Sequence, residues 1–266
     1  MNIIKKELRL GFKPFLIWLV GLFVLDIVGL IKFTGVSEGG VSMSAIIDQI
    51  PRVVQALIGI VGINIETLSG YYAILAYFVL MCGCVYAIYL AGNAMNREIV
   101  DKTYEFIFTK PRSRAAILSM KLIVGVIYLA GFTLVNIVFS YIGLSILNIN
   151  ESIFKEIIYF SIAMFLICLL YYAVTAFICS ICTRPEKGTF YGNVFFLVTF
   201  IIGVVVDMIE KPGIVRILSP MKYFPPIEIL QYQLSIFYII AAIIIIVISS
   251  ILAYSYFNKR DLKAVN

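Results

Sequence analysis

Apolar residues run along this chain in six long segments, separated by shorter stretches that hold most of the charged positions. About 20 apolar residues, at roughly 1.5 Å each, carry a helix across the hydrocarbon core of a bilayer. A helix also satisfies its own backbone hydrogen bonds, which lipid cannot do. The pattern therefore predicts an all-α integral membrane protein with one transmembrane domain over residues 1–266. The predicted spans cover about residues 15–33, 71–94, 115–147, 157–182, 190–209 and 236–257.

The segment before the first span has a different pattern. Lys5, Lys6, Arg9 and Lys13 fall on one arc of a helical wheel, and apolar residues occupy most of the rest. A basic amphipathic helix of this kind lies in the headgroup region with its cations toward water. We therefore expect residues 1–13 to form an interfacial helix, with a frayed basic tail as the alternative. Pro14 would then allow a sharp turn into the membrane.

Two long connections interrupt the apolar segments. Within the first, residues 43–62 place apolar side chains at helical spacing, and Pro51 is expected to break or restart that helix. An interfacial helix, a dip part-way into the membrane and a short helix packed on the spans all fit this pattern. The second connection, residues 210–235, contains four prolines, so no long helix fits there.

Two polar residues fall inside predicted spans. Asp26 lies near the middle of the first span, where a carboxylate costs about 2.5–3.5 kcal/mol on insertion scales, so it should face protein or water. It could line a transport path or pair with a polar group on another helix. Asn136, in the third span, is expected to make a hydrogen bond between helices. Lys121, at the start of the same segment, is expected to stand in the cytosol.

Composition excludes an ordinary soluble enzyme. The chain is 62% hydrophobic and 14% charged, whereas soluble domains are about a quarter charged. It has no histidine, and so lacks the commonest general base and the commonest metal ligand. No catalytic residues and no metal site are therefore expected. The five cysteines lie in or at the ends of apolar segments and are expected to pack as small apolar residues: Cys82, Cys84, Cys168, Cys179 and Cys182.

The distribution of basic residues predicts the orientation. Lys and Arg are enriched in cytoplasmic loops, and placing the N-terminus inside puts fifteen of the 21 there. An even number of spans returns the C-terminus to the cytosol as well. The net charge of +6 is then a signal of topology rather than of nucleic-acid binding. The remaining six are assigned to the outer side: Lys32, Arg52, Lys155, Lys211, Arg216 and Lys222.

The connection between the second and third spans, Asn96–Arg114, carries charges of both signs. Its polar residues gather on one face of a helical wheel and its apolar residues on the other, until Pro111 ends the helix. A short amphipathic helix joined to two spans is suited to lie along a surface and to pass a push from the cytosol to those spans. A solvated loop with a chance amphipathic turn is the alternative.

This stretch resembles the cytoplasmic signature of ABC-2 type ABC transporter permeases. The similarity includes an Arg-Glu pair, a Thr-x-Glu, an apolar pair and a Thr-x-Pro-x-Ser-Arg ending. Lys102 stands where the family usually has Gly. The stretch LSPMKYF, Leu218–Phe224, is also similar to the outer segment before the last span of that family. The matching positions in the connector are Arg97, Glu98, Thr103, Glu105, Phe106, Ile107, Thr109, Pro111, Ser113 and Arg114.

The resemblance implies a permease subunit in the cell (plasma) membrane, most relatives being exporters. It implies a helix over residues 96–111 that couples to a dimer of cytosolic ATPase subunits, which would bind ATP and Mg. It also implies a second permease subunit, identical or a sister chain, within the same membrane lipid. The coupling contact would be formed by Arg97, Glu98, Lys102, Thr103, Glu105 and Phe106.

The sequence itself agrees with a separate energy source. It contains no G-x-x-x-x-G-K-[ST] phosphate loop, so a chain that binds nucleotide would have to be another one. A non-transporting membrane scaffold or sensor subunit shares the same layout and stays open as an alternative. An intramembrane enzyme is disfavoured, because without histidine few nucleophile–base pairs remain. The substrate is not identified by any motif.

Overall fold

The computed structural model describes residues 3–38, 47, 49–100, 113–147, 152–182, 184–209 and 213–259, except the side chains of residues 34–38, 98, 99, 185 and 186. All regular elements in these ranges are helices. Six of them are long and apolar enough to cross a membrane, which confirms the all-α membrane fold. These spans are Ile3–Phe33, Leu68–Arg97, Arg114–Leu147, Phe154–Ile181, Lys187–Met208 and Ile236–Lys259.

The first span is a helical rod in three parts. It consists of α1 (Ile3–Phe23), a π-helical turn η1 (Val24–Val28) and α2 (Gly29–Glu38). Pro14 lies inside α1, so the sharp turn expected at this proline is wrong, and the basic segment continues into the span as one helix. The interfacial placement of residues 1–13 stays a prediction. Proline removes one helical hydrogen bond, but neighbouring helices and local adjustments make it tolerable in membrane helices.

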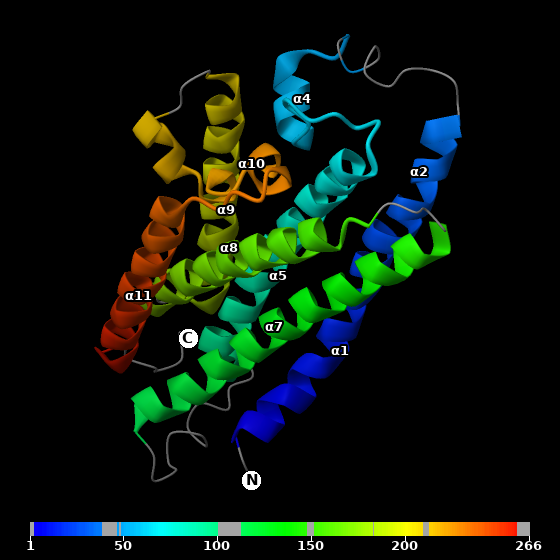
Figure 1. Cartoon of the computed structure of the whole chain (residues 1–266). Coiled ribbons are helices and arrows are strands. Elements are labelled where there is room, and N and C mark those ends of the chain that lie inside the picture. Colours follow the sequence, from blue (N-terminus) through cyan, green and yellow to red (C-terminus); the bar gives the residue numbers. More distant parts are fainter. Residues whose placement is uncertain are drawn as a thin grey trace.

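The remaining spans pack around α8 (Phe154–Ile181), which contacts α5 (Leu68–Val100), α7 (Arg114–Leu147), α9 (Pro185–Met208) and α11 (Ile236–Lys259). The first span packs mainly along α7. Figure 1 shows that α1 begins and α11 finishes toward the same end of the bundle. We call this the termini end, and the opposite end the loop end.

The loop end carries the short helices of the two long connections (Figure 1). Pro51 is the N-cap of α4 (Arg52–Ile58), so the expected restart of the helix at this proline is confirmed. α4 packs on α5 and α9. In its described part, residues 213–235, the proline-rich connection forms short helical turns, which also agrees with its sequence. These are η2 (Gly213–Leu218), η3 (Pro220–Lys222) and α10 (Pro226–Leu230).

Glycine allows very close approach of α8 and α9. A Cβ atom on Gly188 would lie 2.9 Å from the Cα atom of Cys179 and 2.7 Å from its sulfur. Small residues commonly bring membrane helices together in this way, because lipid supplies no hydrophobic force between them. Polar side chains add hydrogen bonds between other helices. The hydroxyl of Tyr254, on α11, donates to Ser119 Oγ on α7 at 2.8 Å.

Candidate functional site

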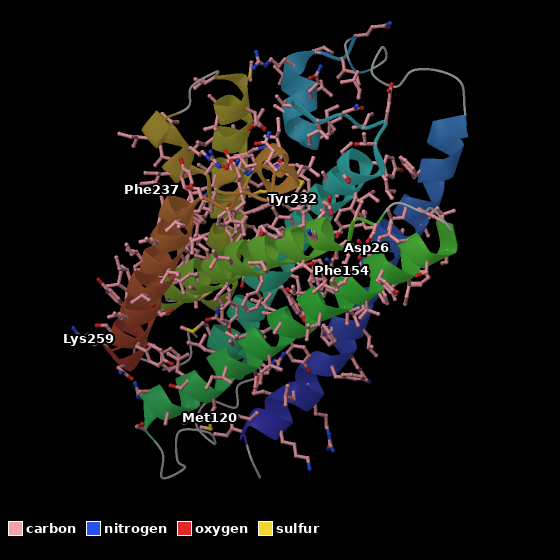
Figure 2. All side chains as sticks on the ribbon, in the orientation of Figure 1. Asp26, Met120, Phe154, Tyr232, Phe237 and Lys259 are labelled. Carbon is pink, nitrogen blue, oxygen red and sulfur yellow. The ribbon has the colours of Figure 1, made fainter. Side chains whose placement is uncertain are left out.

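Asp26 lies inside the bundle, on the π-helical turn η1 of the first span (Figure 2). Only 1% of its surface is exposed, so it faces protein rather than lipid. Single π-helical turns within α-helices occur often at functional sites, because the extra residue redirects a side chain. Ser140 on α7 is its hydrogen-bonding neighbour. The second carboxyl oxygen, Oδ2, is buried without a hydrogen-bond partner among the described residues.

Polar side chains from three further helices continue inward from Asp26. The hydroxyls of Ser140, on α7, and Tyr72, on α5, are 3.2 Å apart. One turn before Ser140, Asn136 donates from Nδ2 to Ser161 Oγ on α8, also at 3.2 Å. This is the hydrogen bond between helices that the position of Asn136 predicts. We call Asp26, Tyr72, Asn136, Ser140 and Ser161 the buried polar cluster.

The buried polar cluster has spare capacity for hydrogen bonds. Besides Asp26 Oδ2, the amide oxygen of Asn136 is buried and has no partner in the part of the chain that the structure describes. An unpaired polar group in an apolar interior costs about 1–3 kcal/mol in mutational data. A transport-path role for Asp26 and Asn136 stays a prediction.

Sequence reasoning missed three members of the cluster, namely Tyr72, Ser140 and Ser161. One signal for Ser140 was present, because it follows Asn136 by four residues and so lies on the same helix face. Tyr72 and Ser161 carry no comparable signal. Serine and tyrosine are ordinary in membrane helices, and only the packing of α5 and α8 against α7 brings these two into the cluster.

A second polar group lies at the termini end. Arg97 Nη1, near the end of α5, donates to Glu7 Oε2 on α1 at 2.9 Å, and both side chains are largely shielded from solvent. The hydroxyl of Tyr128, on α7, donates to the backbone carbonyl of Leu8. Lys121 is buried against protein and lines a small cavity with Glu7, Arg97 and Tyr128. Its expected place on the cytosolic side stays a prediction. The start of α1 is thus fixed to both α5 and α7.

Most of the connector residues lie outside the described residues. Lys102, Thr103, Glu105 and Phe106 are among them, as is the side chain of Glu98. The first part of the stretch, residues 96–100, is the last part of α5 rather than the start of a separate helix. Arg97 therefore extends rigidly from the second span. The coupling contact expected for Arg97, Glu98, Lys102, Thr103, Glu105 and Phe106 therefore stays a prediction.

Among the described residues, neither metal ligands nor disulfide bonds extend the buried polar cluster or the polar group at the termini end. Among the described residues, no three His, Cys, Asp or Glu side chains are placed to hold a metal ion. All five cysteines are free thiols, and Cys84, Cys168 and Cys179 are buried in the helix core. Cys84 and Cys168 contact each other between α5 and α8, where they pack as small side chains.

The six spans and the buried polar cluster define an all-helical, multi-pass membrane protein. Residues 7–254 match the family model described as the multidrug efflux system permease Rv1217c, C-terminal domain. The match covers most of the chain, and the chain belongs to this family. A family of permeases fits a membrane subunit without enzymatic chemistry of its own. No curated protein matches the chain.

Proposed function

We propose that this chain is the membrane permease subunit of an ATP-driven, ABC-2 type exporter. The observation that carries the proposal is the family match over residues 7–254, whose description is that of a multidrug efflux permease. The six spans and the resemblance of the connector to the ABC-2 signature support it. We propose hydrophobic or amphipathic small molecules as the cargo, because the matching family is described as a multidrug efflux permease.

The energy source in this proposal is a dimer of cytosolic ATPase subunits that binds ATP and Mg. It docks on the connector, residues 96–111, with Phe106 in an apolar pocket and the charged residues at the rim. The N-terminus and C-terminus are cytoplasmic, in the plasma membrane. A second permease subunit, identical or a sister chain, completes the path.

The ion pair between Arg97 and Glu7 gives this proposal a mechanical link. Because residues 96–100 are continuous with α5, a displacement of the connector moves the end of that helix. Arg97 holds the start of α1 through Glu7, and Tyr128 on α7 holds it through the Leu8 carbonyl. A push on the connector would therefore be shared by the first three spans. Those spans also supply four of the five members of the buried polar cluster, through Asp26, Tyr72, Asn136 and Ser140.

The test is a comparison of Phe106→Asp with Phe106→Leu in proteoliposomes that contain the cytosolic ATPase that co-purifies with this chain. The aspartate should abolish drug-stimulated ATP hydrolysis and drug uptake, because a charge cannot enter an apolar pocket without a large desolvation cost. The leucine should preserve most of both. Full coupled activity of Phe106→Asp would overturn the docking model. ATP hydrolysis that moves no cargo would favour the scaffold or sensor role instead.

A further inference from the structure

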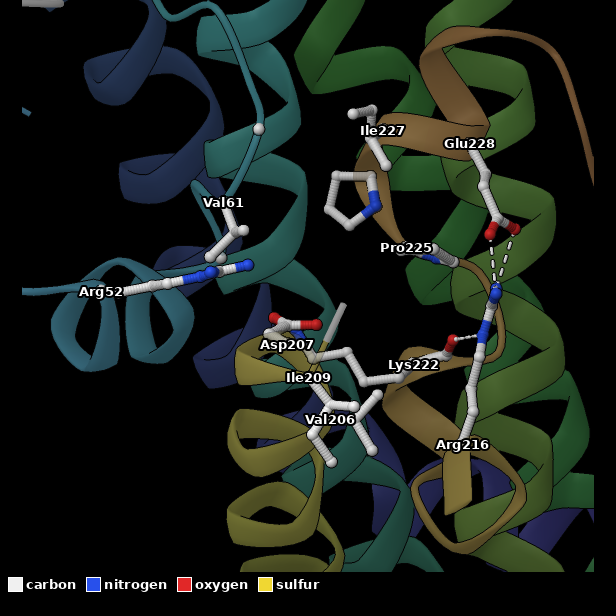
Figure 3. Close-up of a pocket in the computed structure, with 13 residues that line it drawn as sticks. Arg52, Val61, Val206, Asp207, Ile209, Arg216, Lys222, Pro225, Ile227 and Glu228 are labelled. Carbon is white, nitrogen blue, oxygen red and sulfur yellow. Dashed lines mark hydrogen bonds and ion pairs between the residues drawn. The ribbon is translucent and has the colours of Figure 1, made fainter. Parts of the chain in front are cut away.

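A cavity of about 310 Å³ opens at the loop end of the bundle, away from both polar groups described above. It lies between α4, the end of α9 and the turns that run from η2 to α10 (Figure 3). Its size falls at the lower limit of small-molecule sites, which occupy roughly 300–1,000 Å³. Its charged lining residues are Arg52, Asp207, Arg216, Lys222 and Glu228.

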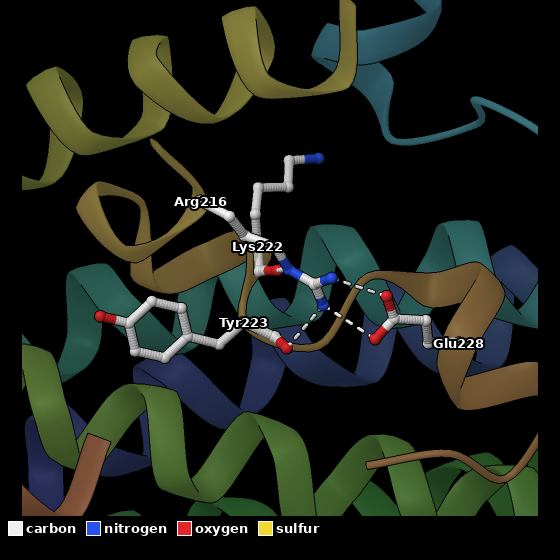
Figure 4. Close-up of polar contacts among 4 residues, drawn as sticks. All are labelled: Arg216, Lys222, Tyr223 and Glu228. Carbon is white, nitrogen blue, oxygen red and sulfur yellow. Dashed lines mark hydrogen bonds and ion pairs between the residues drawn. The ribbon is translucent and has the colours of Figure 1, made fainter. Parts of the chain in front are cut away.

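The guanidinium of Arg216 is occupied by hydrogen bonds within the protein (Figure 4). Its two terminal nitrogens donate to both carboxyl oxygens of Glu228, at 2.7 and 2.8 Å. It also donates to the backbone carbonyls of Lys222 and Tyr223, at 2.6 and 2.9 Å. The guanidinium lies 4.4 Å from the centroid of the Tyr238 ring. Such a bidentate, stacked arginine fixes the loop and has little capacity left for a ligand.

The ammonium of Lys222 is likewise occupied by contacts within the protein. It is 2% exposed, and its ammonium forms an ion pair with Asp207 at the end of α9. The ammonium also lies 4.9 Å from the centroid of the Tyr77 ring. Burial of the neighbouring phenol raises the pKa of Tyr223 to about 12, so its hydroxyl stays neutral and donates to the Ile217 carbonyl. This wall of the cavity is therefore charge-balanced and rigid.

Arg52 differs from the other two cations. It comes from the first turn of α4 and extends across the cavity toward Asp207 and Val61 (Figure 3). It is exposed, and within the described part of the chain it makes no ion pair or hydrogen bond. The cavity thus contains three cations and two anions, and the surplus positive charge is that of Arg52. The rest of the lining is mostly apolar, from Val61, Val206, Ile209 and Ile227.

We propose that this cavity binds a phosphodiester monoanion carried on apolar chains, with Arg52 as the residue that holds the phosphate. A guanidinium fork matches phosphate geometry with two parallel hydrogen bonds. One surplus positive charge favours a net charge of −1 over a zwitterion, and the apolar side of the cavity receives the first part of a chain. The source is either an anionic lipid headgroup or a free anionic amphiphile. This binding proposal does not rest on the proposed coupling to an ATPase.

The experiment measures binding of short-chain, soluble dihexanoyl phosphatidylglycerol to the purified full chain in neutral maltoside detergent. Dihexanoyl phosphatidylcholine is the zwitterionic comparison. Arg52→Gln should raise the Kd for the phosphatidylglycerol about tenfold or more, because the charged fork is lost. Arg52→Lys should give an intermediate value, since it keeps the charge as a point without the fork. The wild type should bind the phosphatidylcholine more weakly than the phosphatidylglycerol.

Lys155→Gln is the matched control. It removes one exposed cation from the same end of the bundle, but Lys155 lies beside Tyr232 and outside the cavity. Its Kd should stay within about twofold of wild type, because exposed charges outside the site are largely screened. Asp207→Asn should tighten binding, because it leaves Lys222 without its counter-charge. Thermal unfolding of each variant verifies that it is folded.

Native mass spectrometry of the membrane-extracted chain separates the two sources. Retained phosphatidylglycerol that is lost in Arg52→Gln supports the site and identifies a lipid. Binding of the soluble probe without retained lipid supports the site and identifies a free amphiphile. The proposal is overturned if Arg52→Gln binds like the wild type, if Lys155→Gln loses as much affinity, or if the two probes bind equally. None of these readouts involves ATP, so the outcome is independent of the proposed function.

Discussion

Arg97 on α5 and Glu7 on α1 form an ion pair, with 2.9 Å between Arg97 Nη1 and Glu7 Oε2. The two residues are 90 positions apart in the sequence. The pair lies where the second span approaches the connector and where the first span begins. Both side chains are largely shielded from solvent, with 18% of Arg97 and 8% of Glu7 exposed. The pair therefore fixes the N-terminal segment to the part of the chain that we propose receives the push of the ATPase.

Removing one member of this pair should destabilise the protein and weaken coupling. Glu7→Gln and Arg97→Gln should each cost roughly 1.5–3 kcal/mol of folding free energy, typical of hydrogen bonds to charged groups. The exchanged pair Glu7→Arg with Arg97→Glu should recover part of that loss. Thermal unfolding in detergent and drug-stimulated ATP hydrolysis are the measurements. Lys5→Gln, at an exposed neighbour, is the control. If the stability losses of Glu7→Gln and Arg97→Gln simply add in the double variant, the two residues are not coupled.

The hydrogen bond between Asn136 and Ser161 should contribute measurably to the contact of α7 with α8. A double-mutant cycle with Asn136→Ala and Ser161→Ala should give a coupling energy of about 0.6 kcal/mol, the average for such bonds between membrane helices. Ser145 provides a comparison, because among the described residues its hydroxyl donates to the Tyr141 carbonyl of its own helix and to no other helix. Ser145→Ala should leave stability nearly unchanged. A coupling energy indistinguishable from zero for the first pair would contradict the geometry.

Tyr232 should stabilise the loop end in a pH-dependent way. Its hydroxyl donates to Glu156 Oε1 at 2.6 Å, and this bond raises the pKa of Tyr232 above its ordinary value. A raised folded-state pKa contributes stability that is complete below the unfolded pKa, about 10, and is lost as the pH rises through the folded value. The Tm of wild type should exceed that of Tyr232→Phe from pH 7 to about 10, and the difference should then shrink.

Tyr141→Phe, at an exposed tyrosine of α7, is the control for this pH series. Its Tm should follow that of the wild type at every pH. A Tyr232→Phe variant that matched the wild type at pH 7 would mean that the bond to Glu156 does not support the loop end.

Gly188 should tolerate no side chain, whereas Gly21 should. An added methyl group at Gly188 meets the backbone of Cys179, which cannot move without separating α8 from α9. Gly188→Ala should therefore cost about 1–3 kcal/mol, as overpacked cores do. A Cβ atom on Gly21 meets nothing within 4 Å, and Gly21→Ala should be neutral or stabilise by roughly 0.5–1 kcal/mol. Equal unfolding temperatures of the two variants would refute the close approach.

Some local features follow from the sequence because one residue type imposes them. Pro51 has no N–H to give to a helix interior, and it caps α4 as expected. Pro14 has the same chemistry, yet α1 passes through it without a break. Proline in a membrane helix is a weak stop signal, because packing against other helices compensates for the lost hydrogen bond. Local chemistry thus predicts a break in a short connection more reliably than in a span.

The sequence by itself determined the six spans, the membrane class, and the inward placement of Asp26 and Asn136. Lipid cannot hydrogen-bond, so apolar length and the cost of an exposed carboxylate suffice for these conclusions. Only the tertiary structure decided which polar groups meet. Glu7 with Arg97, Ser140 with Tyr72, and Asp207 with Lys222 lie on separate elements. Their pairing depends on how helices pack side by side, and no pattern along a single helix encodes that.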